Sequence, residues 1–472
     1  MRGSGERADS DDGLRRTSDR GSAIGATPRV CRVSAQQDIV APVVQAAPRV
    51  PPQAGAWSAL IILCFVYVLN FLDRQLLAIL AKPIQDDLGV TDGQLGLIGG
   101  LYFALFYCIL AIPVGWLADR TNRVRVLSFA CALWSAATMA CGLSTSYAQL
   151  AMARMSVGIG EAGGVPPSYA IVSDYFPPGT RGTALSIYNL GPPIGLALGV
   201  AFGASIAAAY NWRSAFICLG AVGIVTALIV AIFVREPVRG GLDAPAARAS
   251  AATKAEFLPT CKMFFAHPVL RSVSLATGAT QFVTYALLNF ATLFLMREKG
   301  MTLGEVALWY SLLVGIAVSA GMYASGRLID RFARRSKSAY GYLPAIALAV
   351  AIPFFVGFVW APGWELALVF LAVPMFLNYF YLSPAVTLVQ EEVRPNERVL
   401  AGALLLLVMN LIGLGFGPPF LGAVSDYLRP TYPEHSLQLA FYTLVPFYVL
   451  AVVLHLWLAR ILKQQDAIRR NS

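Results

Sequence analysis

Twelve apolar stretches follow one another between residues 57 and 462, and short joints that hold most of the charged residues separate them. Each stretch approaches or exceeds the roughly 18 apolar residues that indicate a membrane-spanning helix. We therefore predict an all-α integral membrane protein with 12 transmembrane helices. The predicted spans are 57–82, 94–117, 124–143, 147–172, 180–208, 212–234, 269–296, 304–328, 340–360, 364–390, 398–422 and 437–462.

Glycine and proline gather in the second, fourth, fifth and tenth stretches, which are therefore weaker predictions of single straight helices. The Pro-Pro pairs at 166–167 and 192–193 are expected to break or kink their helices, because proline lacks a backbone N–H. Gly195, Gly199 and Gly203 recur every four residues. Since small residues let membrane helices approach closely, we interpret these glycines as packing positions rather than ligand contacts.

The composition argues against a soluble enzyme, because 57% of the 472 residues are hydrophobic and only 13% are charged. Soluble proteins carry about 25% charged residues. We expect His267, His435 and His455 near span ends or in loops, and the seven cysteines have no metal-ligand spacing. With no nucleophile–base set and no metal cluster, we predict a protein that is not an enzyme, with no catalytic residue, metal or cofactor.

Basic residues are divided unequally between the two predicted sides of the membrane. The joints on the side of both termini hold 28 of the 36 Lys and Arg residues, and the opposite joints hold five. The positive-inside rule therefore places both termini in the cytoplasm. This asymmetry accounts for the net charge of +10, so no nucleic-acid partner is predicted.

Residues 1–55 hold eight arginines among many Ser, Ala, Gly and Pro residues, without apolar periodicity. This composition predicts a disordered, basic cytoplasmic tail. A signal peptide is not expected, because no apolar region with a small-residue cleavage site follows Arg15-Arg16 closely. Residues 463–472 are predicted to form a second cytoplasmic tail.

The apolar stretches divide into two similar halves. The second span ends in GWLADRTNRVR from Gly115, and the eighth ends in GRLIDRFARR from Gly326. The fifth and eleventh spans both carry Asn-Leu and then a Gly-Pro-Pro turn. We predict six-helix bundles at 56–234 and 269–462, joined by a central cytoplasmic loop at 235–268. In transporters built from such repeats, the ligand path lies between the halves.

These motifs resemble the major facilitator superfamily over residues 57–462. GWLADRTNR is similar to the signature between helices 2 and 3, with Asn122 where that signature usually has Gly, and RMSVGIGEAGG from Arg154 resembles the helix 4 signature. NFLDRQ, GIGEAGGVPPSYAIVSDYF and RGTALSIYNLG together resemble the Spinster branch. That branch is associated with lysolipid and sphingosine-phosphate export in animals. The resemblance implies a bacterial member in the inner membrane.

Two adjacent charges, Asp73 and Arg74, interrupt the apolar first span. A charge at the bilayer centre costs at least about 2.5–3.5 kcal/mol, so it tends to face a cavity and to have a partner. Asp73 and Arg154 lie at similar depths, roughly 13 and 10 Å from the outer ends of their spans. Glu161 shares the helix face of Arg154, about two turns deeper.

The resemblance implies that the first and fourth helices line a central cavity, where these four charges can form one network. Burial disfavours a charged carboxylate and a nearby arginine favours it, so the two effects can balance near physiological pH. We hypothesise that Asp73 or Glu161 binds the proton, while Arg74 and Arg154 bind the anionic part of the substrate. A static charge cluster that holds the two helices together is the alternative.

The helices of the C-terminal half hold almost no central charge, but they carry polar and aromatic residues. The substrate-binding candidates here are Tyr285, Asn289, Asn378, Tyr379 and Asn410. For any single aromatic residue, lipid contact or helix packing is the alternative. The contrast between the halves suggests an amphipathic ligand with a charged head and an apolar tail, which describes a lysolipid and also many drugs.

A cytoplasmic gate is expected where the second and eighth spans end. Its predicted residues are Gly115, Asp119, Arg120, Arg123, Asp330 and Arg331. An aspartate among arginines can cap the next helix or pair across to the other half. An ordinary positive-inside joint is the alternative.

These features favour a proton-coupled secondary transporter that moves an amphipathic, lysolipid-like substrate by alternating access. A proton-driven exporter of small molecules or drugs and an organic-anion symporter are alternatives in the same class. An uncoupled lipid scramblase or channel is the alternative from another class. The expected partners are the substrate, protons and membrane lipids, and the expected state is a monomer.

Overall fold

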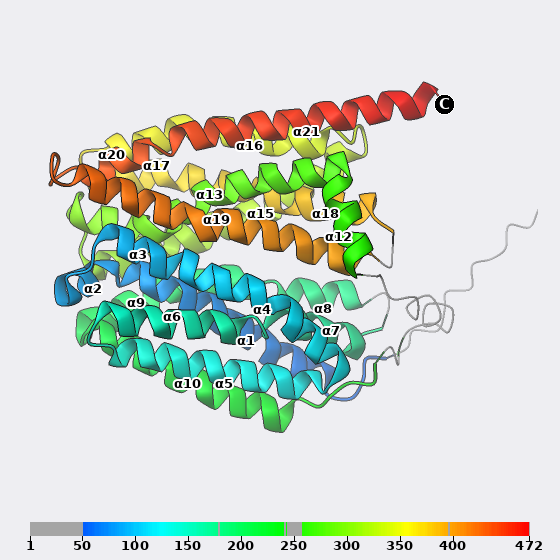
Figure 1. Ribbon diagram of the computed structural model, residues 1–472, viewed down its shortest axis with the longest axis horizontal. Coiled ribbons are helices and arrows are strands. Elements are labelled where there is room, and N and C mark those ends of the chain that lie inside the picture. Colours follow the sequence, from blue (N-terminus) through cyan, green and yellow to red (C-terminus); the bar gives the residue numbers. More distant parts are fainter. Residues whose placement is uncertain (1–50, 178–179, 240–241, 243–256, 395–396, 472) are drawn as a thin grey trace, which may run out of the picture. The chain divides into compact units, whose positions relative to one another are not determined.

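The structure is a computed structural model that describes residues 51–177, 180–239, 242, 257–394 and 397–471. Every regular element in this part of the chain is a helix (Figure 1). By length and composition, 11 helical segments could cross a membrane: Ala56–Ile79, Asp92–Ala118, Arg123–Leu143, Thr183–Ala209, Trp212–Phe233, Pro268–Arg297, Leu303–Ala333, Ala339–Trp360, Trp364–Glu392, Leu400–Leu428 and Ser436–Ala467. They coincide, within a few residues at each end, with eleven of the predicted spans.

The remaining predicted span, 147–172, is interrupted. It forms α6 (Tyr147–Glu161) and α7 (Val165–Tyr175), which a turn at residues 162–164 separates. Two glycines occupy this turn, and the Pro-Pro pair begins α7, where proline's missing N–H costs no hydrogen bond. The Gly and Pro cluster therefore breaks this span.

The N-terminal half packs α5 along α10 and α6, and α1 along α9. The short α2 follows α1 directly and was not predicted. The helices of this half, besides α6 and α7, are α1 (Ala56–Ile79), α2 (Ala81–Leu88), α3 (Asp92–Gly99), α4 (Leu101–Arg120), α5 (Arg123–Leu143), α8 (Arg181–Tyr188), α9 (Gly191–Ala209) and α10 (Trp212–Phe233).

The glycines of α9 pack against α1. A Cβ atom on Gly195 would lie 2.5 Å from the carbonyl oxygen of Val68, and one on Gly199 would lie 2.9 Å from Cβ of Gln75. Only a residue without a side chain fits at either place. The interpretation of these glycines as packing positions is confirmed.

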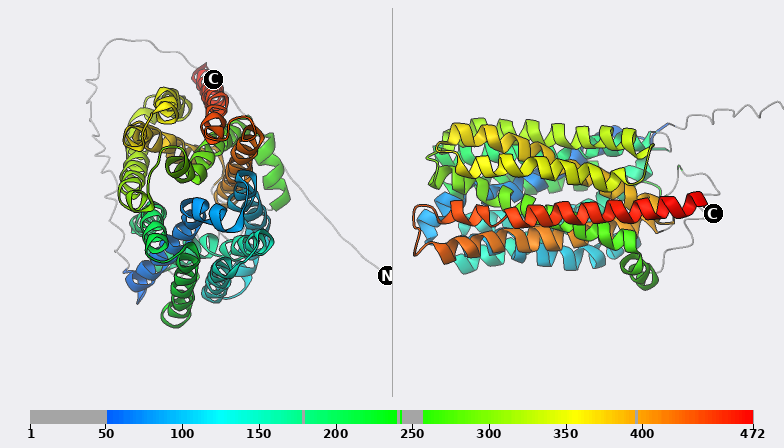
Figure 2. Two further views of the ribbon diagram at one scale, coloured as in Figure 1. Left: turned by 90° about the vertical axis from the view of Figure 1, so that its left-hand side faces the viewer. Right: turned by 90° about the horizontal axis from the view of Figure 1, so that it is seen from above.

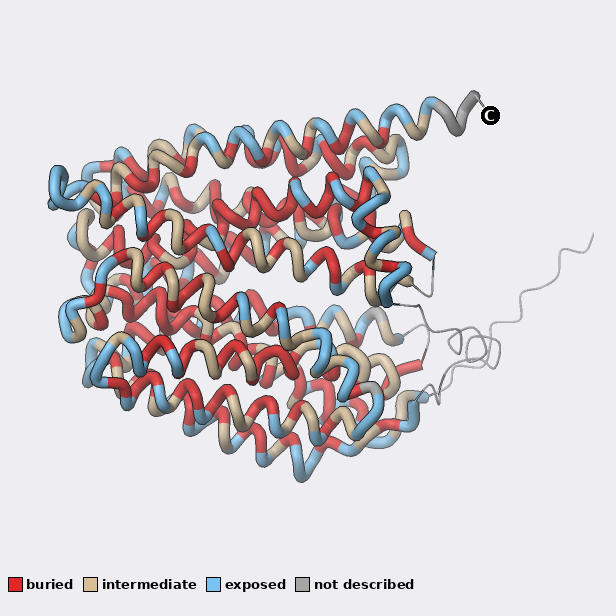
Figure 3. Tube along the Cα trace, viewed as in Figure 1, coloured by how far each residue is buried: buried red, intermediate tan, exposed pale blue. Residues whose placement is uncertain are grey.

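In the C-terminal half, α13 packs against α19 and α21 and is almost wholly buried (Figure 3). A π-helical turn (η1) and a 3-10 turn (η2) interrupt the second and fourth spans of this half. Its elements are α13 (Pro268–Arg297), α14 (Leu303–Glu305), η1 (Val306–Tyr310), α15 (Ser311–Ala333), α16 (Ala339–Trp360), α17 (Trp364–Leu377), η2 (Asn378–Tyr381), α18 (Leu382–Glu392), α19 (Arg398–Leu428), α20 (Ser436–Tyr442) and α21 (Val445–Asn471).

The predicted central loop at 235–268 contains a helix, α12 (Phe257–Ala266), which was not predicted. This helix packs against α13 and α19 through Thr260 and Phe264, which are buried. Parts of this joint and of the predicted tail lie outside the described residues, namely 240–241, 243–256 and 1–50.

The two halves contact each other at one end of the bundle, which we call the α2 end because α2 lies there (Figures 1 and 2). At this end α3 packs against α19, and η1 and α14 pack against α9. The backbones approach closely: a Cβ atom on Gly96 would lie 2.5 Å from the carbonyl oxygen of Pro418, and one on Gly100 would lie 2.6 Å from that of Leu414. We call this close contact the α3–α19 seam.

Candidate functional site

A buried ion pair joins α1 to α6. The Nη1 atom of Arg154 donates to Oδ2 of Asp73 at 3.3 Å, and the Thr138 hydroxyl of α5 donates to Oδ1 at 2.9 Å. Asp73 and Arg154 are each 1% exposed. Removing one partner of such a pair leaves an uncompensated buried charge, which costs about 3–5 kcal/mol. The depth estimate from the sequence, which placed these two residues at the same level, agrees with this contact.

A second ion pair joins the same two helices. The Nε atom of Arg74 donates to Oε2 of Glu161 at 2.8 Å, and Glu161 is fully buried. Arg74 also lies over the rings of Phe103 and Tyr107, each 4.9 Å from the ring centroid. Cation–π contacts of this kind are worth about 0.5–2 kcal/mol each. Arg74 thus has both an anionic and an aromatic environment.

The two ion pairs form one cluster, as the sequence predicted. The Phe103 ring contacts both arginines, since the Arg154 guanidinium lies 5.5 Å from its centroid. Two positive and two negative charges compensate each other, so the cluster is neutral when all four groups are ionised. Oε1 of Glu161 and Nε of Arg154 are buried and have no hydrogen-bond partner among the described residues. One acceptor and one donor therefore remain available within the cluster.

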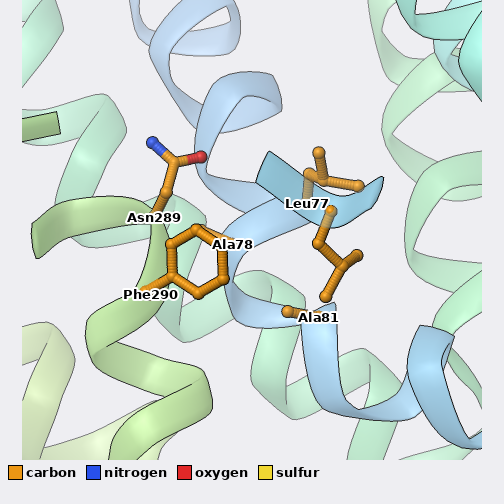
Figure 4. A pocket seen from close by; sticks show the side chains of 6 residues that line it. Leu77, Ala78, Ala81, Asn289 and Phe290 are labelled. Carbon is orange, nitrogen blue, oxygen red and sulfur yellow. The ribbon is translucent and has the colours of Figure 1, made fainter. Parts of the chain in front are cut away.

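The cluster reaches the C-terminal half through Tyr285 of α13, which lies close enough to Arg74 to interact with its guanidinium. One turn further along α13, the Asn289 amide donates to the carbonyl oxygen of Tyr285 at 3.0 Å. Asn289 also lines a small cavity together with Leu77, Ala78 and Phe290 (Figure 4). At about 10 Å³ this cavity holds at most one water molecule.

The other substrate-binding candidates of the C-terminal half have partners within that half. The Asn378 side chain exchanges hydrogen bonds with the Tyr448 hydroxyl at 2.9 and 3.2 Å, and it is buried. Tyr379 is also buried, in η2 beside Asn378. The Asn410 amide donates to the carbonyl oxygen of Leu406 in its own helix at 2.9 Å. The structure therefore brings Tyr285 to the charge cluster and gives the other three local hydrogen-bonding or packing roles.

The predicted gate residues lie at the end of the bundle opposite to α2. Arg120 is exposed and stacks on the Trp116 ring, 4.0 Å from its centroid. Asp330 and Arg331 are exposed at the end of α15, and a Cβ atom on Gly115 would meet nothing within 4 Å. Arg123 forms an ion pair with Asp174 of α7, in the same half, at 2.5 Å. The Asp119 side chain lies outside the described residues.

Sequence reasoning missed an ion pair that connects the halves at the α2 end. Arg297 of α13 donates two parallel hydrogen bonds of 2.9 Å to the Asp92 carboxylate at the start of α3. Asp426 of α19 accepts the backbone N–H groups of Asp92 and Gly93 at 2.9 and 2.8 Å, and Ser425 donates to Asp92 at 2.6 Å. The capping sequence Thr91–Gln94 marks the start of α3, but no spacing in the sequence links it to a residue about 200 positions away.

The prediction for His455 is wrong, because this histidine lies well inside a candidate span. It is 1% exposed in α21, and its Nε2 atom lies 3.1 Å from the Thr280 hydroxyl of α13. The predicted span ended at residue 462, which placed His455 near its end, whereas α21 continues as a helix to Asn471. His455 is a buried link between two helices of the C-terminal half.

The chain resembles known transporters over most of its length. The family model described as Major Facilitator Superfamily matches residues 63–418. An MFS-type efflux pump of Mycolicibacterium smegmatis is 32% identical over 413 residues, which cover 88% of this chain and 94% of that protein. The sphingosine-1-phosphate transporter SPNS2 of Danio rerio is 29% identical over 395 residues, which cover 80% of this chain and 77% of that protein.

A solved structure of a bacterial homologue of the human lysosomal transporter Spinster is similar to this one. That structure is described as inward-facing and unoccupied, and it matches with a TM-score of 0.79 at 29% identity. The match covers 88% of this chain and 99% of that chain.

Two helical halves, paired charges buried in one of them, and relatives that are transporters rather than enzymes identify an integral membrane transporter. The chain belongs to the Major Facilitator Superfamily, and its relatives include members of the Spinster branch.

Proposed function

We propose that this protein is a proton-coupled transporter that moves an amphipathic, lysolipid-like substrate by alternating access. The observation that carries this proposal is the pair of ion pairs, Asp73–Arg154 and Arg74–Glu161, buried between α1 and α6. Charged residues inside a membrane are costly, so their presence favours a functional role over a purely structural one. A neutral cluster of two acids and two bases can bind a proton and an anion together without a net change in buried charge.

The coupling step follows from this neutrality. A proton that binds Glu161 or Asp73 leaves one arginine of the cluster without an anionic partner. Arg74 is the better placed of the two arginines to bind a substrate anion, because its side chain is 12% exposed and that of Arg154 only 2%. Proton and substrate anion therefore favour each other's binding, as thermodynamic linkage requires.

A lysolipid-like substrate agrees with the surroundings of Arg74. An anionic head group can bind the guanidinium, which Tyr285 approaches from the C-terminal half. Aromatic and apolar side chains flank the same place, among them Phe71, whose ring centroid lies 5.1 Å from the Arg74 guanidinium. The relative named as a sphingosine-1-phosphate transporter also supports this substrate class.

Alternating access requires that the two ends of the bundle open in turn. Here the α2 end is held closed by the Asp92–Arg297 ion pair and the α3–α19 seam. The positive-inside rule assigns the opposite end to the cytoplasm of a bacterial inner membrane. The conformation described is then inward-facing, which agrees with the similarity to an inward-facing homologue.

A small-molecule exporter is the second candidate function. It is favoured by the similarity to an MFS-type efflux pump, which is 32% identical over 88% of this chain. Such an exporter would use the same charge cluster for proton coupling and differ only in its substrate. An uncoupled lipid scramblase would not require the cluster to titrate.

The test is proton flux in liposomes. Purified protein is reconstituted with a pH-sensitive dye inside, and a panel of lysolipids and a panel of cationic drugs are added in turn. We expect a lysolipid-evoked proton flux that Asp73→Asn and Glu161→Gln abolish, and that Glu365→Gln, which changes an exposed carboxylate at the start of α17, preserves. Flux evoked by drugs alone would favour the exporter. Lysolipid transport that is insensitive to a pH gradient in the wild type and in Glu365→Gln would refute proton coupling.

A further inference from the structure

A second small cavity lies against Asp73, on the side of α1 that faces α5 and α10. Asp73, Ser135 and Thr138 are its polar lining residues, and Trp134, Leu219 and Gly223 provide apolar walls. We call it the Asp73 cavity. Its volume of about 10 Å³ is close to the minimum that one water molecule needs. Arg154 and Glu161 of α6 are not among its lining residues.

Ser135 gives this cavity a binding group. Its side chain is 1% exposed, and apart from the nearby Cys131 thiol, a weak hydrogen-bonding group, its hydroxyl has no partner among the described residues. A buried hydroxyl without a strong partner is costly, so a water molecule that bonds to it is stabilised. The same hydroxyl lies so close to Gly223 that any side chain there would collide with it. Polar groups and sufficient space therefore coincide at this point.

We propose that the Asp73 cavity binds one water molecule, which bridges Ser135 to Asp73 and passes the proton to and from the Asp73 carboxylate. This inference rests on the proposed proton coupling and names the route of the proton. The water accepts a proton on its oxygen from solvent and gives one of its own protons to Asp73, so its charge is unchanged after transfer. It can donate to the ionised carboxylate and accept from the protonated one, so it fits both states.

Charged and titratable groups surround Asp73 on its other sides. Arg154 and Glu161 approach from α6, Arg74 is its neighbour on α1, and the Cys141 thiol is near on α5. Of the two side chains that hydrogen-bond to Asp73, neither the Arg154 guanidinium nor the Thr138 hydroxyl gives up a proton at physiological pH. Glu161 pairs with Arg74 rather than with Asp73. The water of the Asp73 cavity is therefore the better placed proton donor, and it leaves the Arg74 side free for the substrate.

The test compares two buried hydroxyls on the same helix–helix contact. Ser135→Ala removes the proposed water ligand. Thr226→Val removes a buried hydroxyl of α10 that already donates to the carbonyl oxygen of Val222 at 2.8 Å. We expect Ser135→Ala to lower the rate of proton-driven transport by about fivefold, the change that one hydrogen bond represents. It should leave substrate exchange without a proton gradient unchanged, and Thr226→Val should leave both rates unchanged.

Infrared difference spectra separate this proposal from the proposed function. Spectra are recorded between low and high pH in ordinary water and in water labelled with oxygen-18. We expect a water O–H band that shifts with the isotope in the wild type and in Thr226→Val but is lost in Ser135→Ala. A band that persists in Ser135→Ala, or no band at all, would overturn the water site. If the band behaves as expected but no substrate evokes proton flux, the proposed function fails while the water site stands.

Discussion

A single methyl group on the α3–α19 seam should shift the protein toward the conformation in which the α2 end is open. In Gly96→Ala, the added Cβ would lie 2.5 Å from the carbonyl oxygen of Pro418 and 2.9 Å from Cα of Pro419. Both neighbours belong to the backbone, so no side chain can turn away. Ordinary contact begins at about 3.4 Å, so the helices must separate by several tenths of an ångström.

The magnitude follows from the cost of overpacking, which is about 1–3 kcal/mol for an added methyl group in a close-packed core. The seam exists only while the α2 end is closed, so this cost falls on the closed state alone. The gain in helix propensity on replacing Gly with Ala applies to both states and cancels. The ratio of open to closed molecules should therefore rise by a factor of about 5 to 150.

The assay measures the distance between two spin labels attached to cysteines at Asp86 and Glu434, which are exposed in different halves at the α2 end. Gly96→Ala should add a longer-distance population. Gly115→Ala is the control, because a Cβ atom there meets nothing within 4 Å in this conformation. An unchanged distance distribution in correctly folded Gly96→Ala would refute the claim that backbone contact at the seam limits opening.

Three further changes test other parts of the structure. Arg297→Lys keeps the charge but loses the two parallel bonds to Asp92. The closed α2 end should lose roughly 1–2 kcal/mol of stability, so the longer-distance population of the same labels should grow. Distances equal to those of the wild type would contradict a role of this ion pair in closing the α2 end. Gly195→Ala introduces a clash inside the N-terminal half, which should lower the stability by about 1–3 kcal/mol. Thermal unfolding should therefore occur at a lower temperature, while the label distances stay unchanged. Arg74→Lys should weaken lysolipid binding about tenfold in a direct binding assay, because lysine lacks the planar guanidinium that the Phe103 ring and Glu161 contact. An affinity equal to that of the wild type would exclude Arg74 from the substrate site.

The transmembrane helices could be predicted from the sequence because lipid imposes one strong rule, a long apolar run for each span. The broken span 147–172 was indicated by its Gly and Pro cluster. The helix α12 was missed because its ten residues, although mostly apolar, are too few for a span and lie in a joint with charges around them. Local patterns thus located the helices, but they did not reveal a short helix whose stability comes from packing against α13 and α19.

The charge cluster was predicted from depth together with the family resemblance, which implies that the first and fourth helices line the same cavity. The partner of each charge was not predictable. Adjacent residues on a helix point about 100° apart, and only the rotation of α1 decides that Asp73 meets Arg154 while Arg74 meets Glu161. The Asp92–Arg297 pair was missed for a different reason, since it joins the two halves and no sequence pattern indicates which spans meet across them.

This rotation also explains why two opposite charges stand side by side in an apolar helix. Asp73 faces into the N-terminal half, where Arg154, Thr138 and the Asp73 cavity surround it. Arg74 is directed toward Tyr285 and the C-terminal half. One turn of α1 thus connects the proposed proton site, buried within one half, with the proposed anion site on the side of Tyr285. Because the two residues are covalent neighbours, a change in the charge of one alters the electrostatic potential at the other, whichever end of the bundle is open.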